Sequence, residues 1–511
     1  MSSLPELLRE SARRYPHHPA IKAAEGILDF ATFDRLSDRV AAALAARGVG
    51  HGDRVGLLCP NGVEFALAYA GILKAGAVVT PVNVLLHPDA MAVNLNDAGA
   101  KGLIYHTAFA SQREDLRGRL ADLSFAVAIG ENTAAEDPLW AELLECDAPV
   151  PQPVFNPQED LAAILYTSGT TGRAKGAMLT HANLAANTRS VREAMRWRPG
   201  EDVALVVLPM FHAFAATVGM LTPLTCGCAL APLARFEPEL VARTIAASGA
   251  TVFLGVPSMY NVLLRLSDAS VPFMKGLRLC VSGGAALPGD VQQRFEEKFG
   301  LPVHEGDGPT ECSPVTCVNP VGGRVKPGTV GLPVAGVEMR ILDDEGRELP
   351  DGEVGEIAVR GPNVMKGYWK QPEETAQVFR GEWFLTGDLG VRDEDGYFSI
   401  LDRKKDLVIV NGMNVYPRIV EEVIQRHPAV REVAVVGEAD DLHGEIPVAW
   451  VSLLDGEAVT AAEIRAFCRE RLGRHEVPRQ VYFLPELPKN ATGKILKREL
   501  NKRGEVERGV V

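Results

Sequence analysis

Hydroxyl-bearing residues and glycines gather at residues 166–176, which read YTSGTTGRAKG. The apolar run LAAILY leads into this segment, and HANLAANTRSVREAM behind it predicts a helix that begins near His181. A glycine-rich loop between a strand and a helix can aim backbone N–H groups at an anion, while hydroxyls and a lysine add donors. We therefore predict a phosphate site. The residues expected to form it are Thr167, Ser168, Gly169, Thr170, Thr171, Gly172 and Lys175.

The loop is not of the Walker A type. Gly169 and Gly172 stand too close together for that motif, and no serine or threonine directly follows Lys175. A flexible surface loop has a similar composition, so the rest of the chain must decide between these alternatives.

Bulk composition predicts a protein of several domains that builds positive sites locally. The chain has 511 residues, too many for one core, and 46% of them are apolar. Its net charge of −13 argues against nucleic acid as a partner. A lysine beside a phosphate-type loop is therefore more informative here than in a basic protein.

Cysteine usage and the N-terminal residues favour a cytoplasmic protein. Eight cysteines are scattered without a C-x-x-C pair, which predicts reduced thiols and no structural zinc. The opening MSSLPELLRESARRYPHHPA lacks the apolar core of a signal peptide. Residues 203–234 carry no Asp, Glu, Lys or Arg, but prolines and glycines interrupt them. We predict buried strands, loops and helices there, and no transmembrane segment.

The elements that must position these residues follow an α/β pattern. Apolar strands alternate with amphipathic helices, as in DRVGLLCP, VEFALAYAGILKAG and AVVTPVN, which predicts parallel sheets covered on both faces. After about Glu311, frequent turn signals predict a smaller β-rich subdomain. Beyond ILDRKKD (residues 400–406), helices and strands predict a separate small α+β domain.

Six further motifs follow the loop in order. They are LPMFHAF (208–214), SGGAALP (282–288), EGDGPTE (305–311), WFLTGDLG (383–390), DGYFSILDRKKDLVIVNGMNVYP (395–417) and PKNATGKI (488–495). Together with the loop they resemble the adenylate-forming superfamily, in particular its acyl-CoA synthetases, over essentially the whole chain. The resemblance implies a large N-terminal domain of stacked α/β subdomains plus a β-rich subdomain, residues 1–401. It also implies a small mobile α+β C-terminal domain, residues 402–511, with a hinge near Asp402.

The activity implied by this resemblance is the activation of a carboxylic acid. The acid attacks the α-phosphorus of MgATP to give acyl-AMP and pyrophosphate, and the thiol of CoA then displaces AMP. Two anions meet in the first step, so donors and positive charge must surround them. The resemblance assigns Mg²⁺ to Thr167 and Glu311, in line with the preference of this ion for hard oxygens. It assigns catalytic roles to Lys494, His212, Glu311 and Thr167.

The resemblance also implies the remaining binding residues. The nucleotide is expected to contact Gly283, Gly284, Ala285, Glu305, Gly306, Asp307, Gly308, Thr310, Asp388, Arg403 and Lys494. The acyl pocket is expected to include His212, Phe214, Val256, Tyr260, Gly283 and Gly284. Asp402 is expected at the hinge and Gly412 at the tunnel that admits CoA.

Several of these residues have simple structural alternatives. Asp388 resembles the carboxylate that accepts the ribose hydroxyls, but an aspartate in a turn before Gly390 would look the same. The run DRKKD would also suit a solvated charged segment. A lone histidine in an apolar run, such as His212, is more often structural, and Lys494 has other lysines near it.

Two positions depart from the family pattern. Asp307 stands where the family usually has an aromatic residue that stacks on adenine, so the base must be held in another way. Ile419 stands where many relatives have glutamate, whereas Glu421 is kept.

Small residues in GGAALP and FHAFAATVG leave room in the expected pocket, which favours a medium- or long-chain fatty acid. An aromatic or alicyclic acid is the alternative.

The 17 residues from 495 to 511 leave no room for a fused carrier domain, which favours free CoA over an acyl-AMP ligase that loads a separate carrier protein. A non-catalytic nucleotide-binding relative is the alternative of a different class, and the intact motifs argue against it. A homodimer is left open.

Overall fold

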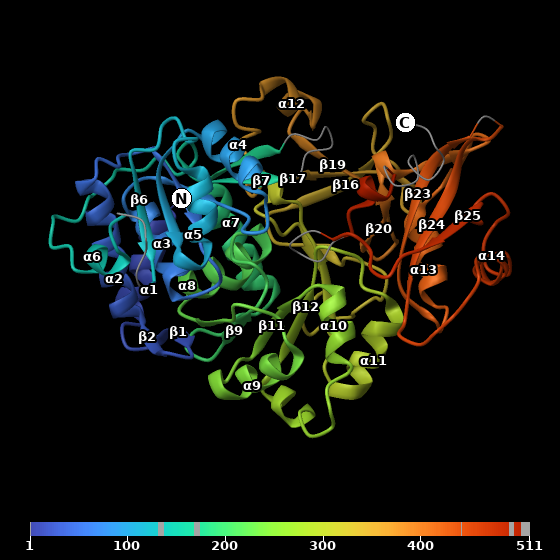
Figure 1. Ribbon diagram of the computed structural model, residues 1–511, viewed down its shortest axis with the longest axis horizontal. Coiled ribbons are helices and arrows are strands. Elements are labelled where there is room, and N and C mark those ends of the chain that lie inside the picture. Colours follow the sequence, from blue (N-terminus) through green and yellow to red (C-terminus); the bar gives the residue numbers. More distant parts are fainter. Residues whose placement is uncertain (1, 131–136, 168–173, 441, 490–494, 502–511) are drawn as a thin grey trace. The chain divides into compact units, whose positions relative to one another are not determined.

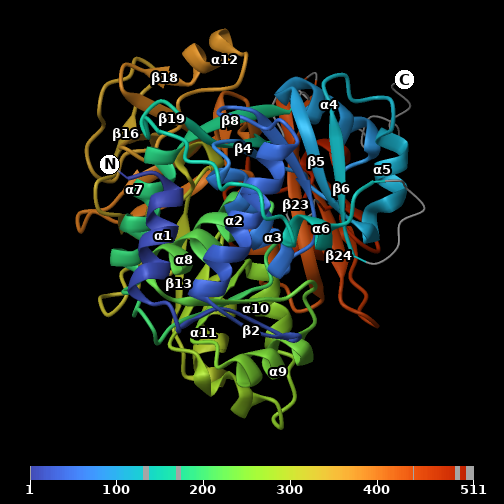
Figure 2. The ribbon, with the colours of Figure 1, turned by 90° about the vertical axis from the view of Figure 1, so that its left-hand side faces the viewer.

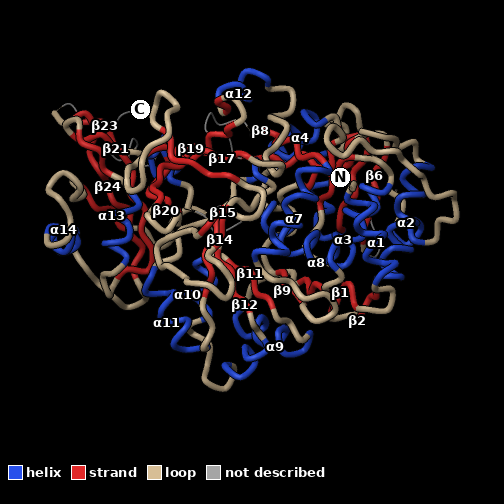
Figure 3. The backbone as a smooth tube through the Cα atoms, turned by 180° about the vertical axis from the view of Figure 1, so that it is seen from behind, coloured by secondary structure: helices blue, strands red, loops and turns tan. Residues whose placement is uncertain are grey.

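The computed structural model describes residues 2–130, 137–167, 174–440, 442–489 and 495–501 (Figures 1 and 3). The chain divides into two compact units. The first comprises Met1–Met339 and Val359–Phe384, and the second comprises Arg340–Ala358 and Leu385–Val511. The predicted domains, residues 1–401 and 402–511, and the hinge near Asp402 stay predictions.

A nine-stranded sheet joins distant parts of the sequence in the first unit. Its strands are β1 (Pro19–Ala23), β2 (Gly26–Asp29), β9 (Val203–Val206), β10 (Ala229–Pro232), β11 (Val252–Gly255), β12 (Leu279–Ser282), β13 (Val303–Asp307), β14 (Cys317–Val318) and β15 (Leu332–Pro333). Their order is β15-β14-β13-β12-β11-β9-β10-β1-β2, so the blue strand β1 pairs with β10 from the green part of the chain (Figure 1).

The sheet is parallel from β13 to β1, as predicted, but its two ends are antiparallel. At one end β2 returns beside β1 through a turn of two residues, which is too short for a parallel crossover. At the other end β14 and β15 are also antiparallel.

Successive side chains of the central strands point to opposite faces of this sheet, and apolar residues occupy both faces. Leu205 and Phe253 lie in a core with the helices on one face, whereas Val206 and Leu254 point toward Gly219 on the other. The helices of the first face are α9 (Pro238–Ser248), α10 (Pro257–Leu263) and α11 (Gly289–Phe299), seen against β11 and β12 in Figure 3. The segment on the second face is a π-helix, η2 (Phe214–Leu221), which α8 (Thr222–Cys226) follows.

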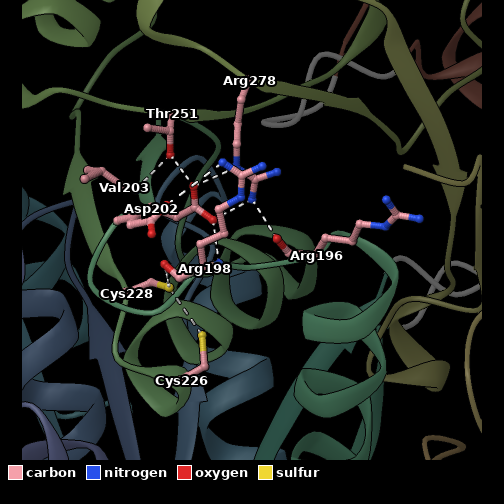
Figure 4. Close-up of polar contacts among 9 residues, drawn as sticks. Arg196, Arg198, Asp202, Val203, Cys226, Cys228, Thr251 and Arg278 are labelled. Atoms are coloured by element: carbon pink, nitrogen blue, oxygen red, sulfur yellow. Dashed lines mark hydrogen bonds and ion pairs between the residues drawn. The ribbon is translucent and has the colours of Figure 1, made fainter. Parts of the chain in front are cut away.

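Buried Asp202 holds the starts of three neighbouring strands together (Figure 4). Its carboxylate accepts hydrogen bonds from Thr251 Oγ1 at 2.8 Å and from Arg278 Nε at 2.7 Å. These residues immediately precede β9, β11 and β12. Burial would raise the pKa of Asp202, but the bonds from Arg278, the Arg198 backbone and Thr251 outweigh it and lower the pKa.

A second, six-stranded sheet has the order β6-β5-β3-β4-β7-β8. Its strands are β3 (Arg54–Leu58), β4 (Val78–Pro81), β5 (Ala100–His106), β6 (Phe125–Ile129), β7 (Leu161–Thr167) and β8 (Lys175–Thr180). Helices of the same unit are α1 (Leu4–Arg14), α2 (Phe30–Ala46), α3 (Val63–Lys74), α4 (Pro88–Ala98), α5 (Ala110–Leu116), α6 (Trp140–Leu144), α7 (His181–Ala194) and α12 (Pro372–Gln377). Figure 2 shows α4 and α5 beside β5 and β6, with which they share a core.

The second unit is rich in strands, as predicted for the later part of the chain. Strands that lie wholly or mainly in it are β16 (Glu338–Leu342), β17 (Gly355–Arg360), β19 (Trp383–Arg392), β20 (Phe398–Arg403), β21 (Val408–Val410), β22 (Met413–Val415), β23 (Val430–Asp440), β24 (Gly444–Leu453) and β25 (Gln480–Phe483). Its helices are α13 (Pro417–Gln425) and α14 (Ala461–Arg469), which pack on the sheet β22-β21-β24-β23. β25 pairs in parallel with β24.

The apolar stretch at residues 203–234 matches its prediction. All eight cysteines are free thiols, and residues 203–234 fold as buried strands and helices. No helix within the described residues is long and apolar enough to cross a membrane.

Candidate functional site

Several of the predicted acyl and nucleotide residues of the first unit follow four strands that are neighbours in the nine-stranded sheet. His212 lies beyond β9, Val256 directly follows β11, Gly283 directly follows β12, and Asp307 ends β13. Because the carboxyl ends of parallel strands meet at one edge, these loops gather there, where ligands bind in open α/β sheets.

Close contacts show that these loops touch. A Cβ atom built on Gly283 would lie 3.3 Å from Phe214 Cε1 and 3.3 Å from the Gly306 carbonyl oxygen. A Cβ atom on the exposed Gly284 would lie 3.8 Å from Val256 Cγ1. The structure therefore brings together five of the predicted residues, with the glycines between the larger side chains.

His212 lies in the turn that starts the π-helix. Its Nδ1 accepts a hydrogen bond from the Phe214 backbone N–H at 3.3 Å, so the neutral ring carries its proton on Nε2. π-helices are rare and often occur at functional sites. The sequence pattern predicted a helix there but could not reveal its widened form.

Asn61 is a residue that sequence reasoning missed. Its side-chain amide donates to the carbonyls of Leu208 at 2.9 Å and Leu233 at 3.1 Å, and its oxygen accepts from Met210 N–H at 2.7 Å. These bonds fix the segment that leads to His212. In the sequence, Asn61 stands in a Pro-Asn-Gly turn, and nothing local indicates its distant partners.

Tyr260 lies in the hydrophobic core between α10 and the sheet. Its side chain is fully buried against Phe253 and Phe295, and its hydroxyl donates to the Val281 carbonyl at 2.8 Å. These contacts give it a packing role, and its place in the acyl pocket stays a prediction.

The EGDGPTE segment is held from several directions. Buried Glu305 accepts the Leu287 backbone N–H at 2.9 Å, which ties the glycine loop after β12 to β13. The Asp307 carbonyl accepts both the N–H and the hydroxyl of Thr316 at 3.0 and 3.1 Å. Of the other predicted nucleotide contacts here, Thr310 is half-buried and Ala285 is exposed.

The ends of the phosphate loop are described, but most of the loop is not. Ser168, Gly169, Thr170, Thr171 and Gly172 lie outside the described residues. Thr167 and Lys175 are register partners in the antiparallel pair β7 and β8, which brings the loop's two ends together.

Lys175 and Glu311 share a common neighbour. Nζ of Lys175 forms an ion pair with Glu374 and lies 5.1 Å from the centroid of the Tyr368 ring. The Tyr368 hydroxyl donates to Glu311 Oε1 at 2.8 Å. Burial and the charge of Glu311 raise the pKa of Tyr368, which keeps it a protonated donor. Neither Tyr368 nor Glu374 belongs to a motif singled out in the sequence.

The proposed magnesium ligands have suitable chemistry. Thr167 offers a hydroxyl oxygen and Glu311 a carboxylate, and the short helix of Glu311, η4 (Thr310–Cys312), packs on β8. No group of three or more His, Cys, Asp and Glu that could hold a metal occurs in the described parts of the chain. A site with few protein ligands is suitable for Mg²⁺, because this ion takes most of its oxygen ligands from phosphates and water.

In the second unit, Asp388 and Arg403 form a cross-strand pair on β19 and β20. Arg403 Nε lies 2.8 Å from Asp388 Oδ1, and Arg403 Nη1 donates to the Thr386 carbonyl at 3.2 Å. The Asp388 side chain is 9% exposed. The structure thus pairs Asp388, which the resemblance assigned to the ribose hydroxyls, with Arg403, which it assigned to the nucleotide.

Asp402 has a structural role of its own. Its carboxylate accepts the backbone N–H groups of Arg403 and Arg418, each at 2.7 Å. Burial raises its pKa, although nearby Lys497 opposes the effect. Lys497 pairs with Glu421 at 2.8 Å, and Glu421 also accepts the Val435 N–H at 2.7 Å.

Gly412 lies within the described residues, whereas Lys494 does not. Gly412 lies with Asn411 in the tight turn between β21 and β22, with a φ of +77° that favours glycine. Lys494 lies outside the described residues, which resume at Ile495. Nothing in the structure explains Ile419.

Known proteins resemble this chain along almost its full length. The AMP-binding enzyme family matches residues 8–369, and the AMP-binding enzyme C-terminal domain matches residues 419–494. A long-chain-fatty-acid–CoA ligase of Bacillus subtilis (strain 168) is 36% identical, over 98% of this chain and 94% of its own length.

Two further proteins are similar to this chain over nearly its full length. A feruloyl-CoA synthase of an Amycolatopsis species is 36% identical, over 96% of this chain and 97% of its own length. The crystal structure of ATP-bound MatB from Rhodopseudomonas palustris superimposes with a TM-score of 0.90 at 33% identity, covering 98% of this chain and 99% of that one.

Proposed function

Because the chain belongs to the AMP-binding enzyme family and is an AMP-forming acid:CoA ligase, we propose that its acid is a medium- or long-chain fatty acid. The observation that carries this proposal is the cluster at the carboxyl edge of the nine-stranded sheet. Gly283 and Gly284 lie between Phe214 and Val256, so an apolar chain meets small residues there. The Bacillus relative, named for long-chain fatty acids, supports the same class.

An aromatic acid is the second candidate. The relative named as a feruloyl-CoA synthase is as similar to this chain as the fatty-acid ligase is, at 36% identity. A ring could also occupy space that the two glycines leave between Phe214 and Val256.

The nucleotide roles are part of the same proposal. Thr167 and Glu311 hold Mg²⁺, which neutralises phosphate charge. The 168–172 loop and Lys175 bind the β- and γ-phosphates, and Asp388 accepts the ribose hydroxyls with Arg403 beside it. Lys494 stabilises charge at the α-phosphate during attack.

The C-terminal domain rotates about Asp402 between the two half-reactions. The adenylation step requires Lys494, whereas the thioester step requires the turn at Gly412. Both residues belong to the predicted small domain and are 82 residues apart in the sequence, so they serve the site in turn.

Thioester formation with a panel of acids tests the substrate class. The purified protein is given MgATP, CoA and straight-chain acids from acetate to octadecanoate, plus benzoate and ferulate. Each buried methylene contributes about 0.8 kcal/mol, so kcat/KM should rise steeply beyond the short acids. A maximum with benzoate or ferulate would instead establish the aromatic class.

A further inference from the structure

The ammonium group of Lys175 is nearly enclosed by protein. Its side chain is 10% exposed, and its Nζ is paired with the carboxylate of Glu374 and lies near the face of the Tyr368 ring. A charge removed from water in this way is costly unless an anion lies beside it. Glu374 therefore neutralises Lys175 within the protein itself.

Hydrogen bonds of the neighbouring residue Thr375 fix the segment that carries Glu374. Glu374 lies on the short helix α12, next to Thr375, whose Oγ1 accepts the Tyr368 N–H at 2.9 Å and donates to the Gln371 carbonyl at 2.8 Å. Tyr368 forms an antiparallel bridge with Ala177 on β8, two residues after Lys175. The carboxylate is thus carried by a segment fixed to the strand that carries the lysine.

One ammonium group cannot neutralise two competing anions at once. Because we assign Lys175 to the β- and γ-phosphates, an incoming triphosphate meets a lysine that already has a carboxylate partner. The two anions repel each other at close range. The Glu374 side chain is 32% exposed, so its carboxylate can turn toward water when phosphate arrives.

We propose that Glu374 competes with the triphosphate of ATP for Lys175, and so lowers the enzyme's affinity for ATP and pyrophosphate. This inference rests on the proposed phosphate role of Lys175. After pyrophosphate leaves, Glu374 pairs with the lysine again, which favours release of this product over its retention.

The test compares Glu374→Gln with the matched control Glu373→Gln, which removes the same charge at an exposed position on the same helix. ATP binding is measured by calorimetry with magnesium and without any acid, so that no chemistry occurs. We expect Glu374→Gln to tighten ATP and pyrophosphate binding about 3- to 10-fold, the scale of a partly exposed ion pair. Glu373→Gln should change binding less than about twofold.

Lys175→Met separates this inference from the role of the lysine. That variant should weaken ATP binding, and adding Glu374→Gln to it should tighten ATP binding less than the same substitution does in the unmodified protein. Unchanged ATP binding in Lys175→Met would overturn the phosphate role of Lys175. Weakened binding in Lys175→Met, with unchanged or weaker binding in Glu374→Gln, would overturn the competition alone. Glu374→Ala repeats the comparison if the glutamine variant unfolds, with thermal unfolding of each variant as the check.

Discussion

At the scale of single residues, the EGDGPTE segment combines a predicted binding role with a strict backbone requirement. A Cβ atom on Gly308 would lie 2.1 Å from the Pro314 carbonyl oxygen, so only glycine fits. The carboxylate of Glu305 accepts a hydrogen bond from the Leu287 N–H. Asp307, between them, cannot stack on a base, so the proposed nucleotide site would select adenine by hydrogen bonds or apolar walls.

Lys494→Ala should separate the two half-reactions. If Lys494 stabilises charge at the α-phosphate, acyl-AMP synthesis should fall by a factor of about 100 or more, as for loss of a preorganised electrostatic donor. Thioester formation from supplied acyl-AMP should persist, because that step involves no attack on ATP. Both rates are measured by rapid quench, with exposed Lys405→Ala as control. Equal losses in the two steps would exclude the assigned role.

At the scale of elements, the start of α7 is joined to the start of α1 through a buried histidine. His181 Nδ1 accepts the Leu4 N–H at 3.3 Å, and its ring meets the edge of Phe155. Its Nε2 is buried and has no hydrogen-bond partner among the described residues. Burial lowers the pKa of His181 to about 4, although Asp160 opposes the shift.

This buried histidine predicts a pH dependence of stability. The unfolded chain binds a proton at a pKa of about 6.5, whereas the folded chain binds it near pH 4, so stability falls as the pH drops through this window. The contribution lost is about 3 kcal/mol in the free energy of unfolding. His181→Gln keeps an acceptor for the Leu4 N–H. In urea titrations its free energy of unfolding should lack this loss of stability at low pH.

Exposed His87→Gln is the matched control, because its side chain is 77% exposed. It should retain the pH dependence of the unmodified protein. If His181→Gln shows the same pH profile as His87→Gln, then His181 titrates normally and the burial argument is wrong.

At the scale of the whole molecule, the residues of the proposed chemistry are distributed over two compact units. The first carries Thr167, Lys175 and Glu311, and the second carries the Asp388–Arg403 pair and the Gly412 turn. An enzyme that first protects acyl-AMP from water and then admits a long thiol needs different surroundings in each step. The proposed rotation about Asp402 meets this need.

Gly412→Leu should slow thioester formation while leaving acyl-AMP synthesis near normal. A side chain at this turn would obstruct the thiol, and the space around its Cβ is open within 4 Å, so no neighbour in the turn itself clashes. The positive φ strains any larger residue, and Gly412→Asn controls for this because asparagine tolerates such torsions. Equal loss of both steps in Gly412→Leu, or full activity, would contradict the alternating use of the site.

The motifs by themselves determined the family, the α/β alternation and the order of the site residues along the chain. Periodicity and turn chemistry are local, so helices such as α7 and strands such as β9 follow from the sequence around them. Only the tertiary structure decided which residues meet. The pairing of Lys175 with Glu374, the Tyr368–Glu311 bond and the clamp by Asn61 join residues far apart in the chain. The order and register of the strands determine these long-range contacts, and neither can be derived from the local pattern of a single sequence.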